Sequence, residues 1–217
     1  MDMYLDSFLD EFGVPQSQRF PDKKYVESYR GKLPETLLSF WEKFGFCTFL
    51  DGLFWVVDPD DYTDLIKSWL NKAGIKDQED CYYVIAKSGY GDLYLWNETL
   101  GRSYEVNSMN AWIIESNTDS TIDLEKQLGL FFATKSPYSL DVEDIDTDEE
   151  MFEAAVEKFG KLEEHEIFGF EPTLVAGGNM GLESLKKVNM QIHLDLILQF
   201  SEPQVITKDD LTNMAFS

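Results

Sequence analysis

The segment from Gly31 to Gly45 constrains the fold most, because it specifies a helix together with both of its ends. Pro34 has a fixed φ and no N–H, which suits the first turn of a helix. Apolar side chains then recur at helical spacing on one face, at Leu37, Leu38, Trp41 and Phe44. Gly45 stands where a left-handed cap would end the helix. An aromatic strand over residues 53–57 follows, so the sequence predicts a helix packed close to a strand.

The neighbouring segments extend this pattern into a mixture of helices and short strands. Asp58 is predicted to cap the helix after strand 53–57, with Pro59 at its first position. Further helices are predicted over 5–12 and 22–30, and strands over 46–49, 81–86, 93–96, 104–106 and 111–115. Short turn sequences separate the later strands, which favours antiparallel neighbours. We therefore predict an α+β domain over residues 1–116, with helices packed on one face of a mostly antiparallel sheet.

The composition changes most sharply at residues 141–150, which hold seven acidic residues and no basic one. Thr147 and Glu150 have capping-box spacing, so a helix is predicted to begin there. The sequence before this segment predicts a polar connection over 117–120 and a helix over 123–133. The sequence after it predicts a strand over 167–175, a turn at 177–178 and a strand-to-helix element over 188–200. We predict a connecting segment over 117–147 and a smaller α+β C-terminal subdomain over 148–217.

The charge balance limits the partners that the surface can attract. The chain of 217 residues has 18 Lys and Arg against 41 Asp and Glu, a formal net charge of −23. Such a surface repels phosphate backbones, so direct nucleic-acid binding is disfavoured, and it attracts basic proteins. Solubility alone is the competing explanation for the acidity. The start of the chain lacks the pattern of a signal peptide, and no apolar run is long enough for a membrane helix, so we expect no membrane contact and a cytoplasmic location.

No residue pattern predicts catalysis, a cofactor or a metal. The two histidines, His165 and His193, have no Cys/His metal spacing around them, and Cys47 and Cys81 are expected to be free thiols. No nucleophile motif of the Gly-x-Ser-x-Gly kind is present. Asp-x-Asp pairs at 58–60 and 144–146 could bind a hard cation, but no calcium-loop pattern surrounds them. A pair of carboxylates for glycosidase chemistry stays open, because nothing in the spacing selects one pair from 41 acids.

The residues that define the first helix also carry a family resemblance. The segment 31–62, with Phe8-Leu9-Asp10-Glu11-Phe12-Gly13-Val14-Pro15 before it, resembles the GAD-like domain of bacterial immunity proteins that are paired with nuclease toxins of the type VI secretion system. A second match, Gly169-Phe170-Glu171-Pro172, Gly177-Gly178, Leu185-Lys186-Lys187-Val188 and His193-Leu194, resembles the small domain that commonly follows it. The Leu-Pro…Phe-Trp…Gly pattern is also loosely similar to the SUKH immunity superfamily. The resemblance implies a protein that is not an enzyme and that neutralises a cognate nuclease, with a DNase preferred.

The charge suggests how such neutralisation could work. A nuclease needs a basic groove for its substrate, and carboxylates can occupy that groove in place of phosphates. The candidate partner-binding residues are acids of two segments, Asp58, Asp60 and Asp61, and Asp141, Glu143, Asp144 and Asp146. For each acid the alternative is an ordinary solvated side chain, and the toxin could also be inhibited by distortion of its active site. A small-ligand-binding or enzymatic α+β domain is the second hypothesis. The third, tRNA binding as in the enzymes that give the GAD-like domain its name, is opposed by the negative charge.

Overall fold

An eight-stranded sheet forms the centre of the computed structural model, which describes residues 3–75, 81–116 and 121–215. In spatial order the strands are β1 (Gln16–Arg19), β2 (Phe46–Phe49), β3 (Phe54–Val56), β4 (Tyr82–Ser88), β5 (Leu93–Asn97), β6 (Gly101–Asn107), β7 (Trp112–Glu115) and β10 (Gln204–Ile206). Every neighbouring pair is antiparallel except β7 and β10, which run parallel. The predicted α+β class with a mostly antiparallel sheet is confirmed.

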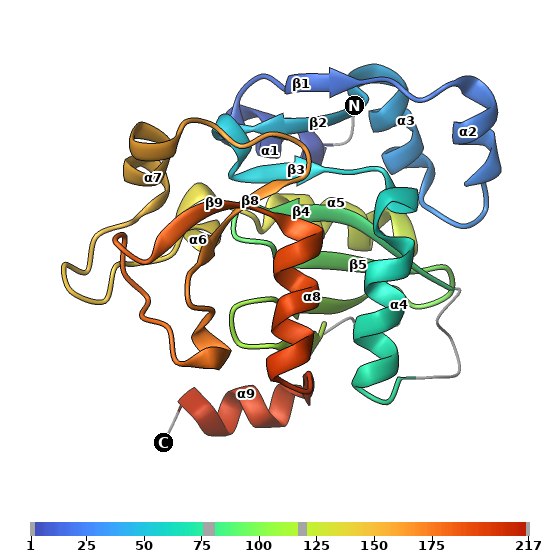
Figure 1. Cartoon of the computed structure of the whole chain (residues 1–217). Coiled ribbons are helices and arrows are strands. Elements are labelled where there is room, and N and C mark those ends of the chain that lie inside the picture. Colours follow the sequence, from blue (N-terminus) through green and yellow to red (C-terminus); the bar gives the residue numbers. More distant parts are fainter. Residues whose placement is uncertain (1–2, 76–80, 117–120, 216–217) are drawn as a thin grey trace.

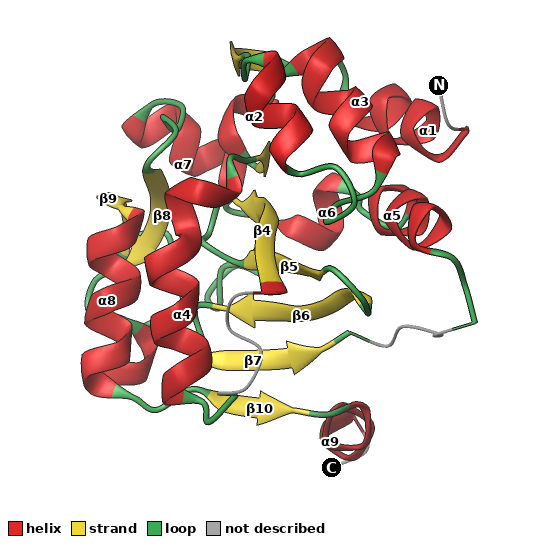
Figure 2. Cartoon of the chain, turned by 90° about the vertical axis from the view of Figure 1, so that its right-hand side faces the viewer, coloured by secondary structure: helices red, strands yellow, loops and turns green. Residues whose placement is uncertain are grey.

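Helices cover both faces of this sheet, not one as predicted from the sequence (Figures 1 and 2). They are α1 (Met3–Phe12), α2 (Lys23–Ser28), α3 (Glu35–Phe44), α4 (Thr63–Lys72), α5 (Leu124–Ala133), α6 (Pro137–Leu140), α7 (Phe152–Phe159), α8 (Met190–Phe200) and α9 (Lys208–Ala215). Phe54 of β3 packs against α1 and α5, whereas α4 and α8 lie on the opposite side. All the residues of β3 and β5 are buried, which is the pattern of strands covered on both faces.

A second, two-stranded sheet packs over the α4 and α8 side. Its strands are β8 (Glu166–Phe170) and β9 (Leu185–Asn189), which pair antiparallel. The Phe168 N–H donates to the Gly89 carbonyl over 2.8 Å, so the hairpin is fixed to the large sheet. One continuous cluster of buried side chains extends from Leu5 in α1 to Leu198 in α8. The division of the chain at residues 116 and 148 stays a prediction, and the connection predicted at 117–120 lies outside the described residues.

The start of α7 differs from the sequence prediction. Thr147 and Glu150 do not form a capping box, because Thr147 sits in a tight turn where its N–H donates to the Asp144 carbonyl over 3.3 Å. The helix begins at Phe152, and its first N–H donates to the Asp141 carboxylate over 3.0 Å. An acid eleven residues upstream therefore takes the place of the predicted local cap.

The helix predicted from Pro34 onward is α3, with Pro34 one position earlier than expected, at its N-cap. Gly45 ends the helix with a φ of 71° and a ψ of −169°, so its φ is positive as predicted but it does not adopt the left-handed helical conformation. Both cysteines are free thiols. Within the described ranges, no helix is long and apolar enough to span a membrane.

Candidate partner-binding surface

The first candidate segment begins with Asp58, which is buried and works inside the chain. Its carboxylate accepts the Asp60 N–H over 3.1 Å, and so it caps the short 3-10 helix Pro59–Tyr62 as predicted. The same carboxylate accepts a hydrogen bond from the Tyr25 hydroxyl, and it forms an ion pair with Arg19 over 3.0 Å. Burial together with the Asp58 contact raises the pKa of Tyr25, so its hydroxyl stays a donor. Asp58 is thus a positioning residue for the acids that follow it.

Asp60 and Asp61 carry the exposed part of this segment. The Tyr29 hydroxyl donates to Asp60 over 2.6 Å. Arg19 donates to Asp61 over 2.8 Å and to Glu164 over 2.7 Å, so one guanidinium joins β1, the Pro59–Tyr62 turn and the segment before β8. Burial and the neighbouring Asp58 raise the pKa of Asp61. This cluster holds more acids than Arg19 can neutralise, and its net charge is negative.

Glu164 belongs to the same cluster, although the sequence reasoning did not select it. It lies 145 residues from Arg19 along the chain, and only the packing of the C-terminal part onto β1 brings the two side chains together. The segment Glu163, Glu164, Glu166 around His165 was the available signal, since an acidic run beside a strand could mark a charged edge. No pairwise spacing in the sequence could have identified its partner.

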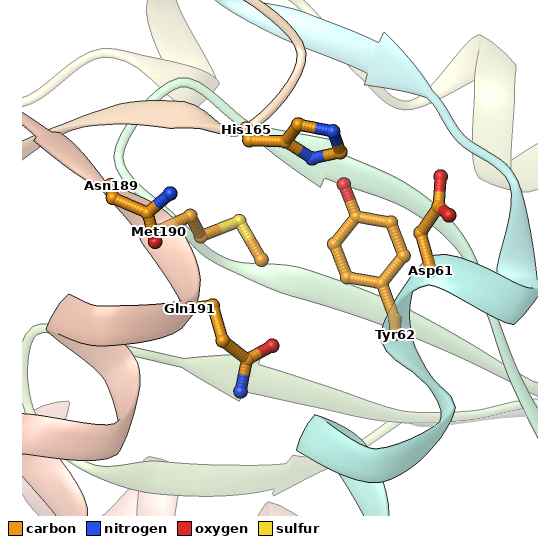
Figure 3. Close-up of a pocket in the computed structure, with 6 residues that line it drawn as sticks. All are labelled: Asp61, Tyr62, His165, Asn189, Met190 and Gln191. Atoms are coloured by element: carbon orange, nitrogen blue, oxygen red, sulfur yellow. The ribbon is translucent and has the colours of Figure 1, made fainter.

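A small polar pocket lies beside the cluster (Figure 3). It encloses about 110 Å³ and is lined by Asp61, Tyr62, His165, Asn189, Met190 and Gln191. The Tyr62 ring projects toward His165, and Asp61 lies to one side of it (Figure 3). The Asn189 side chain accepts the Ile192 N–H over 3.1 Å as the cap of α8. The volume of this pocket is well below the ~300 Å³ at which small-molecule pockets usually start, so this pocket gives little support to the ligand-binding hypothesis.

The second candidate segment is also divided between internal and exposed acids. Asp141 accepts the Tyr90 hydroxyl over 2.6 Å in addition to the Phe152 N–H. The buried Asp144 accepts the N–H groups of Asp146 and Leu182 over 2.8 and 2.7 Å, and these bonds lower its pKa. Both carboxylates therefore hold the loop in shape.

Glu143 and Asp146 point to solvent and are available to a partner. The exposed Tyr138 ring of α6 lies close to Glu143, with its hydroxyl 3.4 Å from the carboxylate. Among the described residues, no hydrogen bond or ion pair connects this segment to the Asp58–Asp61 cluster. The two acidic segments named from the sequence therefore lie on two separate surfaces, and their role in binding stays a prediction. In the same ranges no group of three His, Cys, Asp or Glu side chains is placed to hold a metal ion.

Comparison with known proteins places this architecture. The family model of the GAD-like domain matches residues 3–110, and that of the T6SS immunity protein Tdi1, C-terminal, matches residues 126–201. No curated protein matches the chain. Among solved structures, the crystal structure of Atu4351 from Agrobacterium tumefaciens superposes with a TM-score of 0.82 at 21% identity, covering 95% of this chain and 93% of that one, which shows a common fold. The chain therefore belongs to the type VI secretion immunity proteins in which a GAD-like domain precedes a Tdi1-type C-terminal domain.

Proposed function

We propose that this immunity protein neutralises a nuclease toxin, preferably a DNase, by binding it in the cytoplasm. The family supplies the immunity role, and the observation that supports a nuclease partner is the net charge of −23. A nuclease carries a basic surface for its phosphate substrate, and a strongly anionic protein complements that surface at long range. Direct binding of the immunity protein to nucleic acid would be opposed by the same charge.

Neutralisation proceeds by occupancy, with no turnover of a substrate. The exposed carboxylates of Asp60, Asp61, Glu143 and Asp146 are the proposed contacts. The buried Asp58 and Asp144 and the half-buried Asp141 position them. A stable complex of this kind buries about 1,200–2,000 Å², which is enough to cover a nuclease groove or to distort it. Both outcomes would stop cleavage, and both need a complex that outlasts the encounter.

The test is co-expression with the toxin encoded by the adjacent gene. We expect cells to survive only when both proteins are made, the two proteins to co-purify, and the toxin alone to degrade plasmid DNA. A toxin that kills while leaving DNA and RNA intact would overturn the nuclease assignment. Survival without co-purification would overturn neutralisation by occupancy.

A further inference from the structure

The turn over residues 50–52, between β2 and β3, has an unusual backbone. Leu50 and Asp51 have φ values of 49° and 55°, in the left-handed region that favours glycine, and Gly52 follows at 110°. The Asp51 N–H donates to the Gln16 side chain over 3.1 Å, and the Asp51 carbonyl accepts the Leu162 N–H over 3.0 Å. Strained residues that the surroundings hold in place cluster at binding sites, so this turn warrants a functional explanation.

The turn forms one wall of an apolar groove. The groove encloses about 300 Å³, and its apolar lining comes from the turn, from α6 and from α7: Leu50, Leu53, Pro137, Phe152 and Val156. Leu50 is 36% exposed, so part of its apolar surface stays in contact with water. The left-handed backbone therefore holds an apolar side chain at the edge of an apolar groove.

Acidic side chains surround this groove. Asp51 and Glu153 line its rim, and neither carboxylate makes an ion pair with another described residue. Asp141 lines it too, and the adjoining segment carries the exposed Glu143 beside Tyr138. The groove thus continues one of the two acidic surfaces described above.

The acidic rim of the groove indicates what kind of partner can bind there. A second copy of this chain would bring another −23 charges to the rim, so self-association through the groove is opposed. A partner with lysines or arginines around a projecting apolar side chain complements both the lining and the rim. Interfaces commonly have this anatomy, with an apolar anchor at the centre and charged pairs around it.

We propose that the groove between the turn 50–52, α6 and α7 receives an apolar side chain that the toxin presents from a basic part of its surface. This inference rests on the proposed function and deepens it, because it names where on the immunity protein the toxin is anchored. The left-handed turn presents Leu50 to that side chain. The carboxylates of Asp51 and Glu153 pair with the flanking bases.

The first test replaces Leu50 by Asn, a residue that tolerates the left-handed conformation better than leucine does. Binding is measured by surface plasmon resonance against an inactivated form of the toxin encoded beside the gene. We expect Leu50→Asn to bind at least tenfold more weakly, mainly through faster dissociation, because the toxin's side chain loses its apolar contact with Leu50. The melting temperature should stay unchanged or rise, since the strain is relieved. The control is Leu196→Gln, a leucine of α8 with 37% exposure that does not line the groove.

The second test reverses one charge on the rim. Glu153→Lys should slow association several-fold, whereas Glu157→Lys, the same change one turn further along α7 and outside the groove, should have a smaller effect. If the native protein binds the toxin and Leu50→Asn and Glu153→Lys bind as their controls do, the groove assignment is wrong while the proposed function stands. If the native protein does not bind at all, both proposals fail. A toxin-free dimer that Leu50→Asn dissolves would assign the groove to a second copy instead.

Discussion

Asp141, in the acidic segment 141–146, illustrates how much a single acid contributes to the fold. Its carboxylate accepts the Tyr90 hydroxyl over 2.6 Å and the Phe152 N–H over 3.0 Å. We expect Asp141→Ala to lower the free energy of unfolding by about 2–3 kcal/mol, because a buried hydroxyl and the first amide of α7 lose their acceptor. Urea unfolding measures this loss. The exposed Asp146→Ala is the control and should change stability by less than about 0.5 kcal/mol. Equal losses in the two variants would contradict the capping role.

A second residue-scale prediction concerns Lys87, which is fully buried on β4. Its Nζ donates to the Glu166 carbonyl over 3.0 Å and lies 4.8 Å from the centre of the Trp55 ring. Burial lowers the pKa of Lys87 to about 7, against about 10.4 in an unfolded chain. Above pH 7 the unfolded state therefore binds a proton that the folded state does not, and stability rises with pH.

The measurement is the free energy of unfolding at pH 7.0 and 8.5 for the native protein and for Lys87→Met. The native protein should gain about 1–2 kcal/mol more than the variant over this interval, as the linkage slope requires. Comparing the two proteins cancels the opposite effect of Cys47, whose thiol pKa is raised by burial to about 12. Identical slopes would mean that Lys87 keeps its proton inside the fold.

At the scale of elements, the sequence predicted those helices whose ends are marked by residues close together in the chain. Pro34, the apolar stripe and Gly45 gave the position of α3, and Asp58 followed by Pro59 gave the capped turn in front of α4. These features depend on residues within one turn of each other. The contacts of Asp58 with Arg19 and Tyr25 depend on how distant elements pack, so the candidate site was predicted as residues and not as a geometry.

The strand β10 shows where local signals fail. It has three residues, too few to show a periodicity, and it pairs in parallel with β7 some ninety residues earlier in the chain. The sequence analysis also predicted helices on one face of the sheet only, for a related reason. The buried strands β3 and β5 indicate burial on both faces, but which face each helix covers depends on how the chain packs. The helices α1 and α4 lie on opposite faces, and α5 and α8 from the later chain complete the two layers.

A prediction at this scale tests whether β10 is an integral part of the sheet. The Gln204 N–H donates to the Ala111 carbonyl over 3.0 Å, at the point where β10 joins β7. Gln204→Pro removes this donor and should cost about 1–2 kcal/mol of stability, with faster hydrogen exchange along β7. Gln204→Ala removes the same side chain but keeps the N–H, and it should behave like the native protein. A proline variant as stable as the alanine variant would show that β10 contributes little.

For the whole molecule, the net charge of −23 acts before any contact forms. Two separated acidic surfaces carry part of this charge, the Asp58–Asp61 cluster with Glu164 and the segment 141–146 beside the apolar groove. Under the proposed function, a field built from many carboxylates attracts a basic toxin from any approach, and the local geometry then selects the bound orientation. Long-range attraction and short-range fit are therefore separable in kinetics, because salt screens the first and leaves the second nearly intact.

The last prediction uses this separation. The association rate with the toxin should fall at least tenfold from low to high salt, since the screening length shrinks from about 30 Å at 0.01 M to about 3 Å at 1 M. Dissociation should change much less. Neutralising Glu143 and Asp146 together should slow association more than neutralising Asp10 and Glu11, the same number of exposed acids on α1. A salt-independent rate would remove electrostatic attraction from the mechanism. Equal effects of the two double variants would mean that the overall charge attracts the toxin and that no particular surface is preferred in the encounter.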